Sequence, residues 1–129
     1  MPQVLPMIIL NVDDDEEDIE IFCDAVREID STIICVVARS ADEAMRILSS
    51  DIELPSYIFL DINMPKVDGN ECLKEIRKHD RLKLIPVVMH STHKRKADIE
   101  MYKSLNADFM VKQNSFNDLV RELRRILRK

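Results

Sequence analysis

Charged residues stand directly after three apolar runs of the sequence, at the points where strands would end. Two of these runs are followed by carboxylates and the third by an ammonium group. Carboxylate oxygens are ligands that Mg²⁺ prefers, and Mg²⁺ usually shares them with phosphate oxygens. The pattern therefore predicts a site for a divalent cation and for phosphoryl chemistry. Its charged residues are Asp13 and Asp14 after residues 7–12, Asp61 after residues 57–60, and Lys112 after residues 109–111.

Asp61 could do more than bind a metal ion. A carboxylate can attack phosphorus as a nucleophile and form an aspartyl phosphate. That reaction needs a cation to neutralise the phosphoryl charge and donors to hold the other phosphoryl oxygens. Lys112 could supply the cation, and Ser91, or Thr92 beside it, could supply a hydroxyl just past the fourth strand. Each residue alone could be a solvated lysine or a helix cap, but their shared position at strand ends favours one common site.

The acidic residues after Asp14 have a simpler interpretation. Asp15, Glu16, Glu17 and Asp18 begin a helical pattern. Negative charge at a helix N-terminus is stabilised by the helix dipole. We therefore interpret these four residues as a helix start and not as part of the site.

Strand and helix patterns alternate five times along the chain. The strand runs are continuously apolar, which is typical of a parallel sheet covered on both faces, and the predicted fold class is α/β. Between them, apolar residues recur with a helical period, most weakly around 95–105. In an open parallel sheet the carboxyl ends of the strands share one edge, where ligands bind, so the site residues should meet there. The strands are expected at 7–12, 33–37, 57–60, 85–89 and 109–111.

Two helix starts carry clear signals. Ser40 followed by Glu43 has the spacing of a capping box. Ser115 followed by Asp118 opens the last helix, whose apolar face is expected to include Phe116.

The composition is that of a globular domain. The 129 residues are 46% hydrophobic and 33% charged, and we expect residues 1–129 to form a single domain with no output domain attached. The formal charge of −5 does not suggest nucleic-acid binding. Gly69 is the only glycine, which excludes a Walker A loop and a dinucleotide-binding GxGxxG fingerprint.

The cysteines and the N-terminus indicate a cytoplasmic protein. Cys23, Cys35 and Cys72 are odd in number and lie in apolar patterns, so we expect reduced core residues and no disulfide framework. The N-terminal apolar run is too short to span a membrane and lacks the basic start of a signal peptide. No membrane association is therefore expected.

Two segments resemble the receiver domains of two-component response regulators. Residues 9–15 are similar to the first strand and acidic pair of that family, and residues 60–69, LDINMPKVDG, are similar to its phosphorylation motif. Residues 85–92 and 109–112 fit the family's fourth and fifth strands, so the resemblance covers essentially the whole chain in the right order. It implies the flavodoxin-like (βα)5 fold, a doubly wound parallel sheet with strand order 2-1-3-4-5.

The resemblance also implies a role for each site residue. Asp61 would be the phosphoacceptor, Asp13 and Asp14 the acid pair that binds Mg²⁺, and Lys112 the contact to the phosphoryl group. Three further positions complete the family's pattern. They are the backbone carbonyl of Asn63 as a metal ligand, Ser91 as the switch hydroxyl, and Phe109 as the aromatic ring that turns inward with it.

The chain departs from the family in two places near the site. Gln113 stands where the family often has a proline in a cis peptide, so the path after Lys112 stays open. His93, close to the mouth of the site, is expected to be an ordinary loop residue. The Ser91-Thr92 pair and the missing proline are similar to single-domain regulators of phytochrome-type kinases.

The function implied by the resemblance is signalling. A histidine kinase or a histidine phosphotransfer protein would donate a phosphoryl group to Asp61, and the domain would assist this step without being an enzyme. The output would be a changed surface on helix 95–105, strand 109–111 and the last helix, where a downstream protein or a second copy binds. Two alternatives stay open, a degenerate receiver that works without phosphate and a small Mg²⁺-dependent aspartyl phosphatase.

Overall fold

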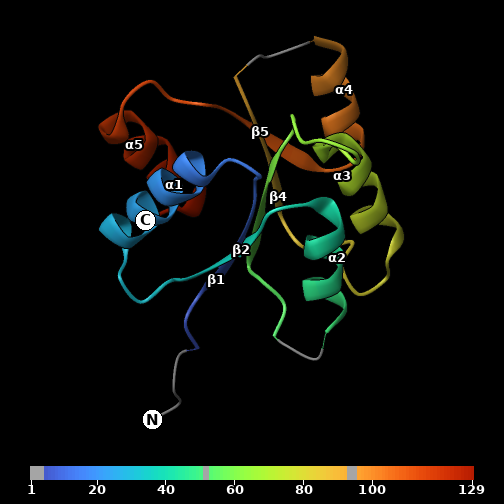
Figure 1. The fold of residues 1–129 in the computed structure, drawn as a ribbon, viewed down its shortest axis with the longest axis horizontal. Coiled ribbons are helices and arrows are strands. Elements are labelled where there is room, and N and C mark those ends of the chain that lie inside the picture. The colour runs from blue at the N-terminus through green and yellow to red at the C-terminus, as the bar shows by residue number, and fades with distance from the viewer. Residues whose placement is uncertain (1–4, 51–52, 93–95) are drawn as a thin grey trace.

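A computed structural model describes residues 5–50, 53–92 and 96–129, which form a five-stranded parallel sheet with helices on both faces (Figure 1). The strand order β2-β1-β3-β4-β5 confirms the predicted flavodoxin-like α/β fold. The strands are β1 (Ile8–Val12), β2 (Ile34–Ala38), β3 (Tyr57–Asp61), β4 (Val87–Ser91) and β5 (Ala107–Val111). The helices are α1 (Glu16–Ile29), α2 (Ala41–Ser49), α3 (Gly69–Lys78), α4 (Lys96–Ser104) and α5 (Phe116–Leu127).

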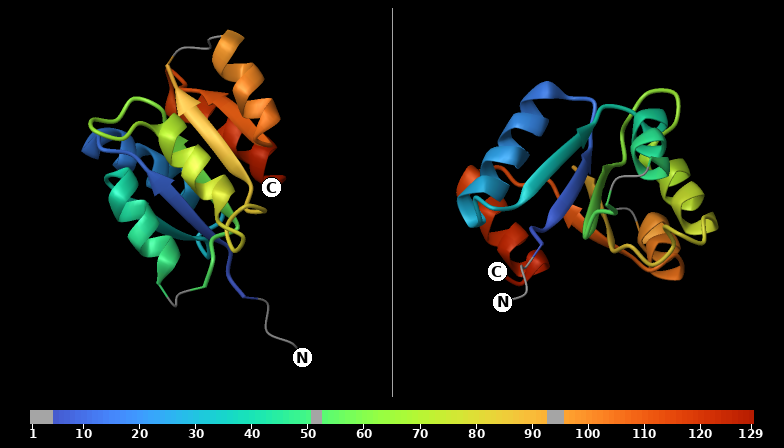
Figure 2. Two further views of the ribbon diagram at one scale, coloured as in Figure 1. Left: turned by 90° about the vertical axis from the view of Figure 1, so that its right-hand side faces the viewer. Right: turned by 90° about the horizontal axis from the view of Figure 1, so that it is seen from below.

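Two apolar layers hold the helices against the sheet. Helices α1 and α5 cover one face, and α2, α3 and α4 cover the other (Figures 1 and 2). Because successive strand residues point to opposite faces, Phe59 and Val88 belong to the core under α1 and α5, whereas Leu60 and Met89 belong to the core under the other three helices. The same alternation directs Asp61, two residues after Phe59, toward the α1 and α5 side.

The fourth strand begins later than predicted. The apolar pattern placed it at 85–89, but β4 pairs with β3 from Val87 to His90 and continues to Ser91. Ile85 is buried before the strand begins, and Pro86 has no N–H for the ladder, although its carbonyl accepts from the Ile58 N–H at 2.9 Å. Ser91 is consequently the last residue of the strand and not a residue beyond it.

Polar N-caps start four of the helices. The side chains of Asp15, Ser40, Asp68 and Ser115 each accept a hydrogen bond from the backbone N–H three residues later. The capping box at Ser40 is only half formed, because the Glu43 carboxylate accepts from the Arg39 N–H at 3.4 Å and not from that of Ser40.

Some expectations fail or lie outside the described residues. Phe116 is 41% exposed and does not join the apolar face of α5, which buries Leu119, Leu123 and Leu127. Cys72 is buried as predicted, but Cys23 and Cys35 are only partly buried. His93 falls outside the described residues. No helix in the described ranges is long and apolar enough to cross a membrane.

Candidate functional site

Three carboxylates gather at the carboxyl edge of the sheet, as the strand ends predicted. Asp13 and Asp14 follow β1, and Asp61 ends the neighbouring strand β3. One oxygen of each carboxylate lies within 4.8 Å of the others. Asp13 and Asp61 are buried, with 3% and 4% of their surface exposed, and Asp14 is open to solvent. Such a set of hard oxygen donors fits a divalent cation such as Mg²⁺.

Backbone groups fix the two buried carboxylates. The Asp15 N–H donates to Asp13 Oδ1 at 3.0 Å, and the Asn63 N–H donates to Asp61 Oδ1 at 3.3 Å. The Asp13 N–H donates to the Ala38 carbonyl at 3.0 Å, which ties the end of β1 to the end of β2. These bonds hold the carboxylates in place before any ligand binds.

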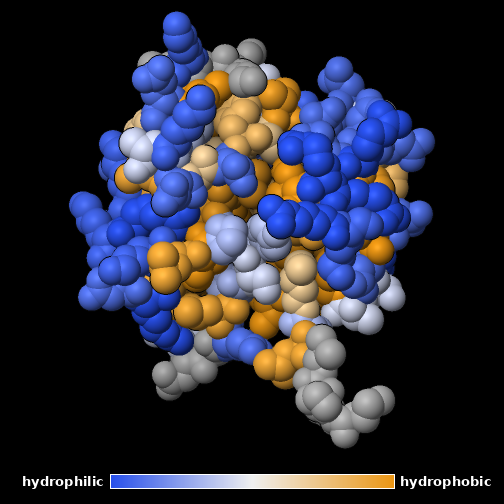
Figure 3. Space-filling view, turned by 180° about the vertical axis from the view of Figure 1, so that it is seen from behind, coloured by the Kyte–Doolittle hydropathy of each residue, from blue (hydrophilic) through white to orange (hydrophobic). Residues whose placement is uncertain are grey.

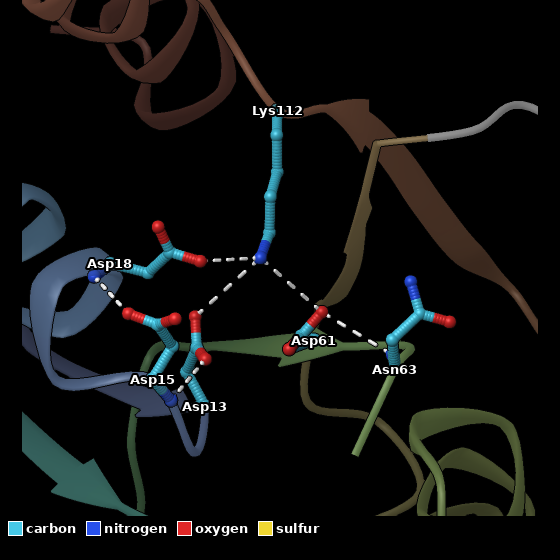
Figure 4. A network of polar contacts seen from close by, with 6 residues as sticks. All are labelled: Asp13, Asp15, Asp18, Asp61, Asn63 and Lys112. Atoms are coloured by element: carbon cyan, nitrogen blue, oxygen red, sulfur yellow. Dashed lines mark hydrogen bonds and ion pairs between the residues drawn. The ribbon is translucent and has the colours of Figure 1, made fainter.

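Lys112 reaches into this cluster from the end of β5 (Figure 4). Its Nζ lies 3.6 Å from Asp61 Oδ1, 4.0 Å from Asp13 Oδ2 and 2.7 Å from Asp18 Oδ2. Its backbone N–H donates to the Ser91 carbonyl at 2.8 Å. No cis peptide bond occurs in the described residues, so the chain passes from Lys112 to Gln113 through a trans peptide. The missing proline has not moved the lysine from the site.

Asp18 is a site residue that the sequence reasoning assigned to the helix start. It stands in the first turn of α1 and makes the shortest contact to the Lys112 ammonium. Asp15 does cap the helix, as the acidic pattern predicted, and Glu16 pairs with Arg39 instead of entering the site. Asp18 differs from these neighbours because the way α1 packs on the sheet turns its side chain toward Lys112.

Burial and charge shift the pKa values of the cluster. Burial raises the pKa of the Asp13 carboxyl from 3.8 to about 7, and the Asp61 charge adds to this, although the Asp15 N–H and the Lys112 charge oppose it. Burial also raises the pKa of Asp61, again against the charge of Lys112. Burial would lower the pKa of Lys112, but the Asp18 hydrogen bond and the carboxylate charges outweigh it and raise that pKa. A second cation would relieve this crowding of carboxylates.

Asp13→Asn should stabilise the metal-free protein at neutral and higher pH. A carboxyl whose folded pKa is raised contributes stability that is present below about pH 4 and is lost as the pH rises toward 7. Asparagine keeps an acceptor for the Asp15 N–H and carries no charge. Since each pKa unit corresponds to about 1.4 kcal/mol, the gain at pH 8 should be roughly 2–4 kcal/mol.

Urea denaturation in chelator between pH 4 and pH 8 measures this effect. The Asp13→Asn profile should be flatter than that of the wild type. Asp42→Asn, at an exposed position of α2, serves as the control and should follow the wild type. If the free energy of unfolding changed equally with pH in the wild type and in Asp13→Asn, ionisation of Asp13 would not be what destabilises the fold.

A pocket opens beside the acid cluster, on the α3 and α4 side of the sheet. It has a volume of about 400 Å³, and Ser91 lines it at the end of β4. Asn70 in α3 also lines it and accepts a 2.7 Å hydrogen bond from the Tyr102 hydroxyl of α4. Phe109 stacks on the same Tyr102 ring, with centroids 6.0 Å apart. Tyr102, which the sequence did not indicate, thus connects the predicted switch residue Phe109 to Asn70 in the pocket that Ser91 lines.

His90 lies between Asp61 and Met110 in the sheet register. Burial lowers its pKa to about 4, and the Lys112 charge adds to this, so the imidazole is neutral at pH 7. Among the described residues, its Nε2 atom has no hydrogen-bond partner. The sequence interpretation gave His90 no role as a phosphoacceptor, and the side chain is only 8% exposed.

The chain belongs to the response regulator receiver family. The family model for the response regulator receiver domain matches residues 9–124. Response regulator Rcp1 of Synechocystis sp. is 30% identical in an alignment of 120 positions that covers 88% of this chain and 82% of Rcp1. The fold, the acid cluster and the strand-end lysine agree with that membership, and two-component signalling is the general function of the family.

Solved structures support the same assignment. The phosphorylated cyanobacterial phytochrome response regulator RcpA aligns with a TM-score of 0.84 at 30% identity, covering 94% of this chain and 91% of RcpA. The Mn²⁺-bound form of Rcp1 aligns with a TM-score of 0.78 at 29% identity, with the same coverages of 94% and 91%. Other curated relatives are longer, and the chain spans 48%, 11% and 45% of three of them.

Proposed function

We propose that this receiver domain accepts a phosphoryl group on Asp61 from a histidine kinase or a histidine phosphotransfer protein. The observation that carries the proposal is the placement of one buried carboxylate between two further carboxylates and an ammonium group. Asp61 is 4% exposed, shares a cluster with Asp13 and Asp14, and lies 3.6 Å from Lys112 Nζ. A structural ion pair would need one carboxylate and one cation, whereas this cluster holds an excess of negative charge.

The chemistry is an in-line displacement at phosphorus. The free Oδ of Asp61 attacks, the new O–P bond forms, and the bond between phosphorus and the donor nitrogen breaks with its electron pair going to the donor. The Lys112 ammonium lies where it can neutralise charge on a phosphoryl oxygen. Asp18 holds that ammonium at 2.7 Å and so positions it.

Asp13, Asp14 and Asp61, with the backbone carbonyl of Asn63, would hold the Mg²⁺ ion. When bound, the ion neutralises charge on the carboxylates and on the phosphoryl oxygens. The Mn²⁺-bound form of Rcp1 among the similar structures supports a divalent cation in this family. The raised pKa of Asp13 supports it further, because burial and the Asp61 charge disfavour its ionised form and a bound cation would offset both.

Mg²⁺ should stabilise the wild type, and Asp14→Ala should remove most of that effect. A ligand at a hundred times its Kd stabilises the folded state by about 2.7 kcal/mol through mass action. Asp14 is exposed, so its replacement should do little to the metal-free fold. Thermal melts in chelator and in increasing Mg²⁺ measure the shift. Glu17→Ala, an exposed acid in the first turn of α1, should respond like the wild type; an equal response of Asp14→Ala would remove Asp14 from the metal site.

The switch is proposed to use Ser91 and Phe109. A phosphoryl group on Asp61 would attract the Ser91 hydroxyl, which ends the neighbouring strand in register with Val111. Movement of the β4 end would free room for Phe109 to turn from its stack on Tyr102. A ligand shifts such an equilibrium only through contacts that differ between the two states. The Ser91 hydroxyl and the Lys112 ammonium would supply them.

Ser91→Ala should therefore still accept a phosphoryl group but should not undergo the conformational change that follows. The variant keeps the nucleophile and the acids, and it should still gain one phosphoryl group from a small donor. It should lose the phosphorylation-dependent chemical-shift changes in α4 and β5, which two-dimensional NMR detects. Thr92→Ala, at an exposed position beside it, is the control and should keep them. Long-range shifts that persist in Ser91→Ala would assign the signal to another route.

The proposed output surface lies on α4, β5 and α5. Seen from behind, hydrophobic residues gather on this side of the molecule between two strongly hydrophilic flanks (Figure 3). Val111 at the end of β5 and Phe116 at the start of α5 are 37% and 41% exposed. A downstream protein or a second copy of the chain would cover them. The similarity to a phytochrome response regulator favours a phytochrome-type kinase as the phosphodonor.

Stoichiometry distinguishes this function from a phosphatase. The domain should consume a small acyl phosphate until each chain carries one phosphoryl group, and later consumption should follow only the slow loss of that group. A phosphatase would turn over a generic phosphate ester many times per chain. A degenerate receiver would consume nothing. Comparing the phosphate released with the phosphate bound per chain, with and without Mg²⁺, separates the three outcomes.

A further inference from the structure

Two thiols touch each other on the α1 side of the sheet, outside the acid cluster. Cys23 lies in the middle of α1, and Cys35 lies in β2, the edge strand of the sheet. Their Sγ atoms are 3.1 Å apart and share a hydrogen bond. Both side chains are partly exposed, whereas Cys72 is buried in the core on the other face. The proposed signalling chemistry does not involve this contact.

We propose that Cys23 and Cys35 form a reversible disulfide when the protein meets a hydroperoxide. A disulfide needs the sulfurs about 2.05 Å apart, so the bond forms with a closing movement of about 1 Å. An edge strand and a surface helix can supply a movement of that size. The chain between the two cysteines already turns from α1 back to β2, and no rearrangement of the sheet is required.

The two thiols are unequal, and the difference assigns their roles. The hydrogen bond between the two thiols lowers the pKa of Cys23 to about 7; burial opposes this shift and the nearby Arg27 charge supports it. The same contact raises the pKa of Cys35, and burial adds to that. The thiolate is the reactive form of cysteine. We assign the attacking role to Cys23, which has the Arg27 guanidinium one turn further along α1, and the resolving role to Cys35.

The reaction balances with one hydroperoxide. The Cys23 thiolate attacks a peroxide oxygen, the O–O bond breaks, and the hydroxide that leaves takes up a proton to become water. Cys23 is then a sulfenic acid. The Cys35 sulfur attacks the Cys23 sulfur, the S–S bond forms, and the S–O bond breaks to release a second water with the Cys35 proton. Two thiols and one hydrogen peroxide give one disulfide and two waters.

The bond would fasten α1 to the edge strand. Helix α1 also pairs with the residue after β2 through the exposed Glu16 and Arg39 ion pair, which can open easily. A covalent link across twelve positions of sequence also restricts the unfolded chain. The oxidised protein should consequently melt at a higher temperature than the reduced protein, and a dithiol should reverse the change.

Thiol counting on the full chain tests the proposal. Reduced protein is treated with hydrogen peroxide, quenched with an alkylating reagent under denaturing conditions, and analysed by intact mass and peptide mapping. The expected product has lost two hydrogens, joins the Cys23 and Cys35 peptides, and carries one alkyl group on Cys72, the internal control. Cys35→Ser should stop at a sulfenic acid on Cys23 that a 1,3-dione captures, with no peroxide-dependent rise in melting temperature.

Two results would overturn the proposal. One is full alkylation of Cys23 and Cys35 under conditions that oxidise free cysteine. The other is a product in which the disulfide joins two chains or includes Cys72. Cys23→Ser adds a check on the assigned roles, because Cys35 alone should stay reduced at the same peroxide concentration. Oxidation of Cys35 in that variant at the wild-type rate would contradict them.

Discussion

Asp61→Asn should gain no phosphoryl group from a small acyl phosphate in Mg²⁺, whereas the wild type should gain one. Asparagine keeps the shape of the side chain and can still accept from the Asn63 N–H, which donates to Asp61 Oδ1 at 3.3 Å. It lacks the anionic oxygen that attacks phosphorus. The fold should survive the change, because removing one of three crowded carboxylates relieves repulsion. The loss should therefore be complete and should not reflect unfolding.

Intact-mass measurement before and after incubation with the donor detects this loss. Asp42→Asn, the same change at an exposed position of α2, should label like the wild type. A thermal melt of Asp61→Asn confirms that the variant is folded. Labelling of Asp61→Asn to the wild-type level would place the phosphoacceptor elsewhere.

Gly69→Ala should destabilise the fold by about 1–3 kcal/mol, the range for atoms forced into packed space. A Cβ at this position would lie 2.4 Å from the Asp61 carbonyl oxygen and 2.9 Å from Ile62 Cα, and both are backbone atoms that cannot turn away. The Gly69 N–H also donates to the Ile62 carbonyl at 3.1 Å. Helix α3 can begin against the end of β3 only because this residue has no side chain.

The direction of the change in stability distinguishes this steric effect from helix propensity. Inside an exposed helix, glycine to alanine normally stabilises by up to about 1 kcal/mol. Urea denaturation of Gly69→Ala should show the opposite sign. Lys74→Ala, on the exposed side of the same helix, should stay within about 0.5 kcal/mol of the wild type. A Gly69→Ala protein as stable as the wild type would mean that α3 can move away from the end of β3 without a loss of stability.

The strand ends explain why much of the site could be predicted. Asp13, Asp61 and Lys112 each follow an apolar run, and parallel strands bring such positions to one edge. The structure places the Lys112 ammonium 4.0 Å and 3.6 Å from the two carboxylates, although the lysine is far from both in sequence. Strand order followed from the resemblance to the family and was confirmed. These conclusions needed only the direction of each strand and not its exact first residue.

Contacts that depend on helix rotation could not be predicted in the same way. Asp18 looked like one more acid in a favourable helix start, and only the packing of α1 turns it toward Lys112. The contact between Cys23 and Cys35 depends on the same rotation, since it joins a helix to a strand. The predicted start of β4 was wrong because Ile85 is apolar and buried but lies before the paired residues.

Chemical trapping can identify the phosphorylated residue of the wild-type protein directly. The domain is labelled with a small acyl phosphate in Mg²⁺ and treated with borohydride, which reduces an acyl phosphate to an alcohol. Fragmentation of the peptides then locates the change. We expect homoserine in place of aspartate at position 61 and unmodified Asp13 and Asp14. Homoserine at another aspartate, or a phosphoryl group retained on a histidine, would contradict the assignment of Asp61.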